Sequence, residues 1–292
     1  MPEGDTLFKV AGYMAPRLVG HELKQVWVAG APLPHLGRRT VLGVRAWGKQ
    51  LLVTLTPQGL EGHVVRVHLG MHGSWHSYAP GAPLQNSVGP SDLWLMRADG
   101  HRFVCFRPQD VEVLRVADVP HSAVLGRLGP DLLAPTFDDA AVLERLDKLA
   151  AHTPLIDILL DQNIAAGLGN VYKSELLFLY GLHPLTPKAH VPPAILRQIF
   201  LDGRTLLQRN LGGWPRTITY DRSAQPDDPA RPRYFVYGRA NAPCLRCNTV
   251  LERALWGRHG RSCYFCPRCQ PESTRQAAVG DPAYSPQLSR VP

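Results

Sequence analysis

The chain has 292 residues, 45% of them hydrophobic, so it is long enough to bury a substantial core and to form two domains. No apolar run approaches the roughly 18 residues that a membrane-spanning helix needs, and no signal peptide is recognisable, so we expect a cytoplasmic protein. The formal net charge is +8, and the whole excess lies in residues 197–292, where 15 arginines accompany 7 acidic residues. An excess confined to one region favours a polyanionic partner.

The first residues place a nucleophile beside a carboxylate. An initiator Met is removed when a small residue follows it, so the mature chain should begin with the secondary amine of Pro2, next to Glu3. An α-amine titrates near pH ~8, so much of it is unprotonated at neutral pH. Its attack on a sugar aldehyde carbon would give an iminium ion, which is a strong electron sink, and Glu3 could move protons on the same sugar. On these two residues alone, an ordinary exposed terminus is the simpler interpretation.

The next segments predict a helix followed by a β-sandwich. Asp5 to Leu18 has the apolar spacing of an amphipathic helix, whose positive end lies beside the N-terminal amine and carboxylate. From about Leu23 to Val116 the pattern changes to short strands. Leu93–Ala98 and Arg102–Phe106 flank an Asp-Gly pair, which is a strong hairpin signal.

Helical patterns take over after Pro135. Thr136 and Asp139 suit a capping box for the first helix of this region. Further helices are predicted over residues 154–162, 171–180 and 193–211. Residues 214–233 are rich in Pro, Arg and Asp and are too long for an ordinary connection, which predicts a mobile functional loop.

A glycine-containing turn ending in Gly167, Leu168, Gly169 and Asn170 connects two of these helices. Glycines let a backbone approach a phosphate closely, and the exposed N–H groups of the following helix bind anions. We expect Asn170 to cap that helix and to offer its amide to the same phosphate. As a mere helix connection the turn would be unremarkable, so the motif alone is weak support for DNA binding.

Five of the six cysteines fall within residues 244–269, which suits a metal site in a reducing compartment better than a disulfide scaffold. Four of them form two Cys-x2-Cys pairs with the spacing of a closed, tetrahedral and structural zinc site: Cys244, Cys247, Cys266 and Cys269. The fifth, Cys263, lies three residues before Cys266, so Cys263, Cys266 and Cys269 have the spacing of part of an iron–sulfur cluster motif. The Cys-Pro that would supply the fourth ligand of such a motif is missing. The sequence therefore predicts one structural zinc ion, with Cys263 outside its ligand set.

Together, the Pro2-Glu3-Gly4 start, the segment from Leu159 to Asn170 and the paired cysteines resemble the formamidopyrimidine-DNA glycosylase/endonuclease VIII family of base-excision repair enzymes. The resemblance runs to about Gln270. The threonine at position 6 resembles the residue found there in the endonuclease VIII branch. It implies an α+β protein: a catalytic β-sandwich with flanking helices, a helical domain with a helix–two-turn–helix motif, and a β-hairpin zinc finger. The expected domains are residues 2–134, 135–233 and 234–270, followed by a disordered tail over 271–292.

The resemblance also implies roles for residues that the sequence alone would leave unassigned. Lys49 joins Pro2 and Glu3 in the catalytic set and contacts a backbone phosphate near the lesion. Met71, with His72 beside it, fills the space left by an extruded base. Arg261 grips the phosphate that flanks the lesion. Considered alone, Lys49 and Arg261 would be surface residues and Met71 a core residue.

The implied function is a bifunctional DNA glycosylase and AP lyase that forms a Schiff base at Pro2 and cleaves the strand by β,δ-elimination. Phe106–Leu114 lacks the Arg and Phe probes of the formamidopyrimidine branch, which favours oxidised pyrimidines over the alternative, oxidised purines. A non-catalytic zinc-finger DNA-binding protein would not need the intact Pro2, Glu3 and Lys49. A proline-nucleophile tautomerase would leave the cysteine module unexplained. We expect a monomer, associated with the nucleoid, that acts on damaged double-stranded DNA, with single-stranded DNA as a second possibility and no membrane partner.

Overall fold

The computed structural model describes residues 2–28, 30–58, 61–84, 89–223, 228 and 230–272, so most of the predicted tail lies outside it. The chain divides into two compact units, Met1–Arg127 and Leu128–Pro292, which we call the N-terminal and C-terminal units. Among the described residues, no helix combines the length and the apolar character needed to cross a membrane.

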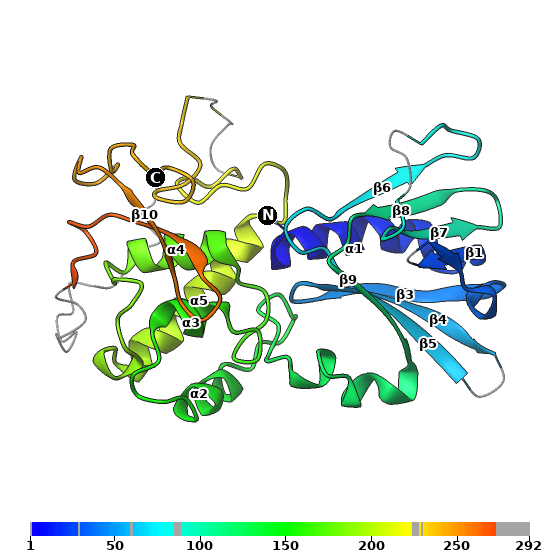
Figure 1. The fold of residues 1–292 in the computed structure, drawn as a ribbon, viewed down its shortest axis with the longest axis horizontal. Coiled ribbons are helices and arrows are strands. Elements are labelled where there is room, and N and C mark those ends of the chain that lie inside the picture. The colour runs from blue at the N-terminus through cyan, green and yellow to red at the C-terminus, as the bar shows by residue number, and fades with distance from the viewer. Residues whose placement is uncertain are drawn as a thin grey trace. The chain divides into compact units, whose positions relative to one another are not determined.

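The described part of the N-terminal unit contains one long helix and nine strands (Figure 1). Its elements are α1 (Gly4–Leu18), β1 (Glu22–Val28), β2 (Ala31–Pro32), β3 (Arg39–Trp47), β4 (Gln50–Gln58), β5 (Glu61–His68), β6 (Ser74–Tyr78), β7 (Leu93–Arg97), β8 (Arg102–Phe106) and β9 (Asp110–Arg115). Short 3-10 helices lie at Pro34–Leu36, Val116–His121 and Leu125–Arg127. The predicted N-terminal helix is confirmed, and so is the hairpin at Asp99 and Gly100, where β7 and β8 pair in antiparallel fashion.

The strands form one path in the order β6-β8-β7-β1-β3-β4-β5-β9, and β2 pairs with β1 beside this path. The path folds into two layers, which are joined where Glu22 and Leu23 of β1 pair with Thr40 and Arg39 of β3 (Figure 1). One apolar core contains buried side chains from α1 and from both layers: Leu7, Met14, Leu51, Val65, Leu95 and Phe103 are among them. The predicted β-sandwich is confirmed.

The C-terminal unit is helical, with a hairpin near its end. Its elements are α2 (Asp139–Asp147), α3 (Leu155–Leu160), α4 (Asn170–Leu179), α5 (Pro193–Arg209), β10 (Glu252–Trp256) and β11 (Arg261–Phe265), with a 3-10 helix at Lys188–His190. The N-cap of α2 is Asp138, whose carboxylate accepts a hydrogen bond from the Ala141 amide at 2.9 Å. The predicted capping box with Thr136 and Asp139 is therefore wrong, because α2 begins at Asp139, two residues later than a Thr136 cap would place its first residue.

The predicted mobile loop over residues 214–233 is partly packed. Asn210 exchanges two hydrogen bonds with Thr217, in which its amide donates to the Thr217 carbonyl at 2.9 Å and accepts from the Thr217 amide at 2.8 Å. The guanidinium of Arg216 lies 5.0 Å from the centre of the Tyr172 ring, and residues 216–220 are buried. The expectation of mobility is therefore wrong for this part, while residues 224–227 and 229 lie outside the described residues.

Candidate active site and nucleic-acid interface

The predicted catalytic residues of the N-terminal unit converge at one end of the sandwich. The last turn of α1 lies beside the beginning of β3, because Val19 forms a bridge with Val41. The helix packs along β3 and β4, and its 15 residues rise about 22 Å. Its N-terminus therefore lies toward the opposite end of β3, where β3 turns into β4 (Figure 1).

Glu3 immediately precedes α1 and is fully buried, while Pro2 is half-buried. The backbone carbonyl of Glu3 accepts hydrogen bonds from the amides of Thr6 at 2.9 Å and Leu7 at 3.1 Å. As the N-cap, Glu3 leaves the helix in an extended conformation, with φ −134°. This geometry fixes the backbone of the carboxylate-bearing residue directly after the proline. Removal of Met1 would leave the Pro2 nitrogen as an amine directly beside this carboxylate, which could then transfer protons near it.

Lys49 lies in a two-residue turn with Gly48, closed by Trp47 opposite Gln50. Gly48 has φ +54°, a conformation that glycine adopts without strain. Behind the turn, Nδ1 of His68 donates a hydrogen bond to the Lys49 carbonyl at 3.0 Å. Burial lowers the pKa of His68, so the ring is neutral near pH 7 and its proton stays on Nδ1. No sequence pattern indicated this supporting role of His68.

The loop between β5 and β6 reaches the same end of the unit, because Gln50 pairs with His68. It is a tight loop in which the Gly73 amide donates to the Leu69 carbonyl at 3.0 Å. A side chain at Gly73 would clash with that carbonyl, so only glycine fits there. At the tip, Met71 is 54% exposed and His72 is exposed, whereas Leu69 is buried. Met71 is therefore not a core residue, and its exposure leaves it accessible to a ligand.

In the C-terminal unit, Gln162 organises the turn between α3 and α4. Its side-chain amide donates to the carbonyls of Leu160 at 2.9 Å and Leu168 at 3.0 Å, and its oxygen accepts from the Gly167 amide at 3.0 Å. Gly167 has φ +129°, which a residue with a side chain rarely adopts. The predicted helix–two-turn–helix geometry is present, and Gln162 supports it through contacts that no sequence pattern indicated.

Asn170 does not cap α4, contrary to our prediction. The N-cap is Gly169, and Asn170 is the first helical residue. Its side-chain oxygen accepts a hydrogen bond from Nζ of Lys173 at 2.7 Å instead of bonding to the backbone of the helix. The helix begins one residue earlier than the sequence suggested. Asn170 therefore lies in its first turn, where the side-chain oxygen faces Lys173.

A buried glutamate connects the same helix to the segment that leads into the cysteine module. The carboxylate of Glu175 accepts hydrogen bonds from three consecutive amides: Phe235 at 2.7 Å, Val236 at 2.9 Å and Tyr237 at 2.8 Å. Burial raises the pKa of Glu175, although these hydrogen bonds oppose the shift. Glu175 therefore holds the start of the module against α4.

Arg261, on the hairpin of the predicted zinc finger, lies beside the turn between α3 and α4. Arg261, the exposed first residue of β11, lines a surface pocket of about 270 Å³ together with Asp161, Gln162 and Asn163 from the turn. Across the pocket, the Arg258 amide donates to Oδ1 of Asp157 at 2.8 Å, which fixes the hairpin tip against α3. The structure thus brings together two segments that lie almost a hundred residues apart. The exposed cationic side chain of Arg261 suits a phosphate.

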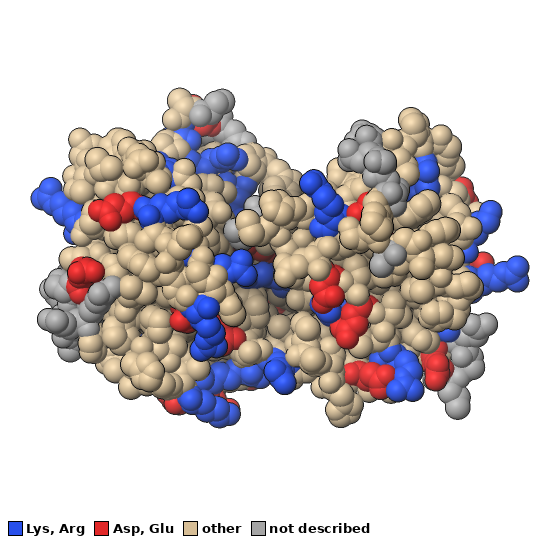
Figure 2. Space-filling view, viewed as in Figure 1, with Lys and Arg blue, Asp and Glu red and all other residues tan. Residues whose placement is uncertain are grey.

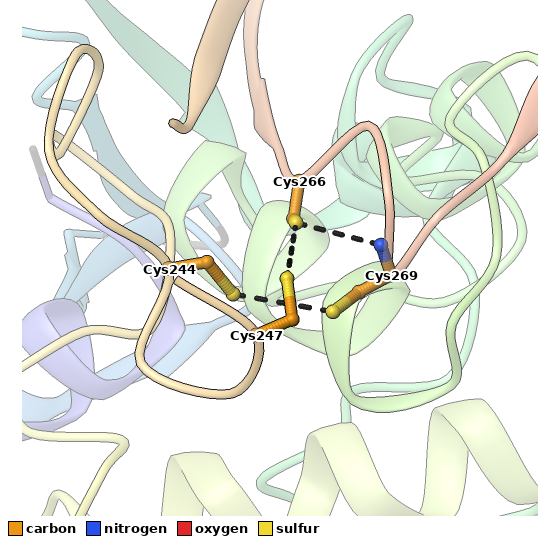
Figure 3. A group of neighbouring side chains, drawn as sticks. All are labelled: Cys244, Cys247, Cys266 and Cys269. Carbon is orange, nitrogen blue, oxygen red and sulfur yellow. Dashed lines mark hydrogen bonds between the residues drawn. The ribbon is translucent and has the colours of Figure 1, made fainter. Parts of the chain in front are cut away.

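The four paired cysteines form one cluster. Figure 3 shows their sulfur atoms pointing toward one another, and all four lie within 4.8 Å of each other. The Cys244–Cys269 and Cys247–Cys266 sulfur distances are 4.0 Å and 3.4 Å, close to the roughly 3.8 Å expected for sulfurs tetrahedrally bound 2.3 Å from zinc. Hydrogen bonds from Thr249 lower the pKa of Cys247 to about 6. The cluster can therefore hold one metal ion, and Cys263 is outside it.

Basic side chains are spread over the surface of the C-terminal unit (Figure 2). This distribution agrees with the excess of arginine in residues 197–292. Several are anchored rather than free: Arg204 donates to the carbonyl of Ala134 at 2.8 Å, and Arg209 donates to Asp221 at 2.9 Å. The remaining exposed cations, including Arg261, can bind a polyanion.

Comparison with known proteins agrees with this geometry. Residues 1–119 match the family model of the formamidopyrimidine-DNA glycosylase N-terminal domain, and residues 128–214 match that of the H2TH domain of the same family. A crystal structure of a Lactococcus lactis formamidopyrimidine-DNA glycosylase in complex with DNA containing an oxidised pyrimidine has a TM-score of 0.72 and 22% identity. The match covers 93% of this chain and 100% of that one, so the fold is shared along almost the whole chain.

Two curated relatives are more similar in sequence. The "Probable endonuclease 8 2" of Streptomyces coelicolor is 36% identical over 276 residues, which cover 92% of this chain and 94% of that protein. The "DNA-(apurinic or apyrimidinic site) lyase Nei2" of Mycolicibacterium smegmatis is 32% identical, covering 94% of this chain and all of that protein. The chain therefore belongs to the formamidopyrimidine-DNA glycosylase/endonuclease VIII family, on its endonuclease VIII-like side, and is a base-excision repair enzyme with DNA glycosylase and AP lyase activity.

Proposed function

We propose that the protein excises oxidised pyrimidines from DNA through a Schiff base at the Pro2 nitrogen and then cleaves the strand by β,δ-elimination. One observation carries this proposal. The Pro2–Glu3 end of α1, the Lys49 turn and the exposed Met71 loop meet at one end of the N-terminal unit. These segments supply a nucleophile, a proton-transfer group, a cation and an apolar probe.

In the proposed reaction, the Pro2 nitrogen attacks C1′ of the damaged nucleotide, and the glycosidic bond breaks as the base departs with a proton. Glu3 assists base departure and the proton transfer that opens the sugar ring. The resulting iminium acidifies the C2′ proton, whose loss expels the 3′ phosphate. A second elimination expels the 5′ phosphate. Lys49 binds a phosphate near the lesion and stabilises its charge.

The C-terminal unit is proposed to hold the DNA backbone. Asn170, at the start of α4, and Arg261, beside the helix–two-turn–helix turn, would each bind a phosphate. Zinc is the proposed metal of the cysteine cluster, because four thiolates with tetrahedral spacing are its preferred closed set. Its chemistry here is structural. We propose that a monomer acts on damaged double-stranded DNA of the nucleoid. The solved structures that share this fold contain DNA with an oxidised pyrimidine or an abasic site.

The preference for pyrimidines is supported by the short connection between β8 and β9. Only three residues, 107–109, join Phe106 to Asp110, so no long loop is available there to carry opposite-strand probes. We expect thymine glycol in a duplex to be excised at least about tenfold faster than 8-oxoguanine, measured as single-turnover rates of strand scission after alkali. Faster excision of 8-oxoguanine would select the oxidised-purine alternative, and binding without scission of either lesion or of an abasic site would select a non-catalytic DNA-binding protein.

Replacing Arg261 with alanine should weaken binding to lesion-containing and undamaged DNA alike. The loss of one phosphate contact should also reduce the salt dependence of the affinity by about one unit of slope. Fluorescence anisotropy over a range of salt concentrations measures both quantities. Arg115→Ala is the matched control, because it removes the same charge from an exposed arginine that pairs with Asp118. An affinity and slope equal to those of the wild type would make Arg261 an ordinary surface residue.

Replacing Met71 with alanine should slow excision of a paired damaged base more than cleavage at a preformed abasic site. An apolar side chain helps to replace the extruded base in the stack, and an abasic site has no base to extrude. We expect a difference of about tenfold between the two losses in single-turnover rate. Since Met71 is exposed, folding should be unaffected. Equal losses on both substrates would contradict the wedge role.

Replacing Glu3 with glutamine should remove base excision and spare much of the cleavage at abasic sites. Glutamine keeps the shape of the side chain but cannot take up or deliver the proton that accompanies base loss. At an abasic site the sugar aldehyde is already available to Pro2. Parallel assays with thymine glycol and abasic duplexes test this separation. Unchanged excision of thymine glycol would remove Glu3 from the mechanism.

A further inference from the structure

The described residues include one lysine side chain that is fully buried within the C-terminal unit. Lys173 lies on α4 and has an exposed fraction of 0%. Burying an ammonium group is costly unless several acceptors replace its water shell. The proposed mechanism gives this cation no role, although it lies three residues after Asn170 and within the helix that follows the phosphate-binding turn.

The ammonium group of Lys173 bridges two elements that the proposed function assigns to DNA binding. It donates to the side-chain oxygen of Asn170 at 2.7 Å, on its own helix. It also donates to the backbone carbonyl of Ser262 at 2.8 Å and contacts the Cys263 sulfur at 3.3 Å, both on β11. Ser262 directly follows Arg261 in that strand. One side chain therefore joins the first turn of α4 to the strand that carries the finger arginine.

The contact also determines which way the Asn170 amide faces. An ammonium group can only donate hydrogen bonds, so the atom of Asn170 that faces Lys173 must be the oxygen. The other terminal atom of the same side chain is then the NH2 group, which only donates. A phosphate oxygen only accepts, so this orientation leaves the matching donor group for a phosphate. With the amide reversed, the oxygen would face the phosphate and repel it.

We propose that Lys173 is a positioning residue for DNA binding, which orients the Asn170 amide and couples α4 to the Arg261-bearing strand. This inference rests on the proposed DNA-binding role of Asn170 and Arg261. Lys173 itself touches neither the reacting atoms nor the pocket at the turn. Its signal in the sequence is a charged residue inside the otherwise apolar first turns of α4, between Tyr172 and Ser174.

The coupling is tested first without DNA, by hydrogen exchange and by NMR of the Asn170 side-chain amide. Lys173→Met keeps the length of the side chain and removes its charge and donors. We expect it to speed exchange of the β11 amides about fivefold or more and to shift the Asn170 amide resonances, with the metal retained. The matched control is Lys188→Met, because Lys188 donates to the carbonyls of Leu146 and Leu149, away from both elements. Unchanged β11 exchange and an unchanged amide signal, or loss of the metal, would overturn the inference.

A double-mutant cycle tests the consequence for DNA. Lys173→Met should weaken binding to a duplex with a tetrahydrofuran abasic analogue about tenfold, the size expected when a hydrogen bond to a charged group is lost. In the wild type, Asn170→Ala should weaken binding to this duplex by at least as much. In the Lys173→Met background it should weaken binding by less than about threefold, because the amide is no longer oriented. Lys173→Arg should recover part of the affinity.

The outcomes separate this inference from the proposed function. Equal costs of Asn170→Ala in both backgrounds would show that Lys173 does not act through Asn170. In the Lys188→Met background, the loss of DNA affinity caused by Asn170→Ala should equal the loss that it causes in the wild type. A wild-type protein that binds none of the duplexes would reject the proposed function, and the DNA-free measurements would then decide the coupling by themselves.

Discussion

Retaining Met1 in front of Pro2 should abolish strand cleavage at abasic sites while leaving DNA affinity within about twofold of the mature protein. Acylation turns the secondary amine into an amide, whose nitrogen lone pair is delocalised and no longer nucleophilic. We expect the single-turnover lyase rate to fall by at least ~10³-fold, equivalent to about 4 kcal/mol of activation free energy. Cleavage of a 5′-labelled abasic duplex measures the rate.

The control uses the same protein sample. Treatment of the Met1-retaining protein with methionine aminopeptidase exposes Pro2 again and should restore the lyase rate without any other change. Full lyase activity with the N-terminus blocked would contradict a Pro2 nucleophile. Lys49 would then be the first lysine to examine, because it lies at the same end of the N-terminal unit.

Replacing Cys247 or Cys269 with serine should remove the metal and abolish DNA binding while the N-terminal unit stays folded. The module has a small core, Phe178, Val236, Leu251 and two of the cysteines, so it depends on the metal for its stability. Structural zinc contributes about 10–16 kcal/mol of apparent binding free energy in comparable small modules. Metal analysis, circular dichroism and anisotropy together measure these effects.

The matched control for these variants is Cys263→Ser. Cys263 is buried on β11 beside the cluster but is not one of its four members, and a serine hydroxyl can still accept a hydrogen bond from Lys173. This variant should keep one zinc per chain and its DNA affinity. Full zinc content in Cys247→Ser, or iron with sulfide in the wild type, would contradict the zinc assignment.

Local sequence patterns predicted the parts of the fold that depend on local physics. The amphipathic period placed α1 within one residue, the Asp99-Gly100 pair placed the β7–β8 hairpin, and the two Cys-x2-Cys pairs placed the metal cluster. In each case the determining interactions lie within a few residues of one another, or depend on a ligand spacing that few other structures use. The pairing of β1 with β3, which joins the two layers of the sandwich, had no comparable signal.

The candidate site was harder to predict where it depends on contacts between distant segments. The exposure of Met71 follows from the tight loop between Leu69 and Gly73, whereas its sequence pattern fits a core position equally well. Asn170 lost its predicted capping role because its side chain bonds to Lys173, which is itself held by the Ser262 carbonyl of β11, 89 residues after Lys173. Such contacts exist only once the finger has packed on α4.

The central claim is that the Pro2 nitrogen forms the covalent intermediate, and borohydride trapping tests it most directly. Sodium borohydride added while the protein cleaves an abasic duplex should reduce the iminium to a stable amine and link the DNA to the protein. After trypsin digestion, mass spectrometry should place the modification on the peptide Pro2–Lys9, at its N-terminal nitrogen. A modification at Lys49, or strand cleavage without any trapped complex, would contradict the mechanism.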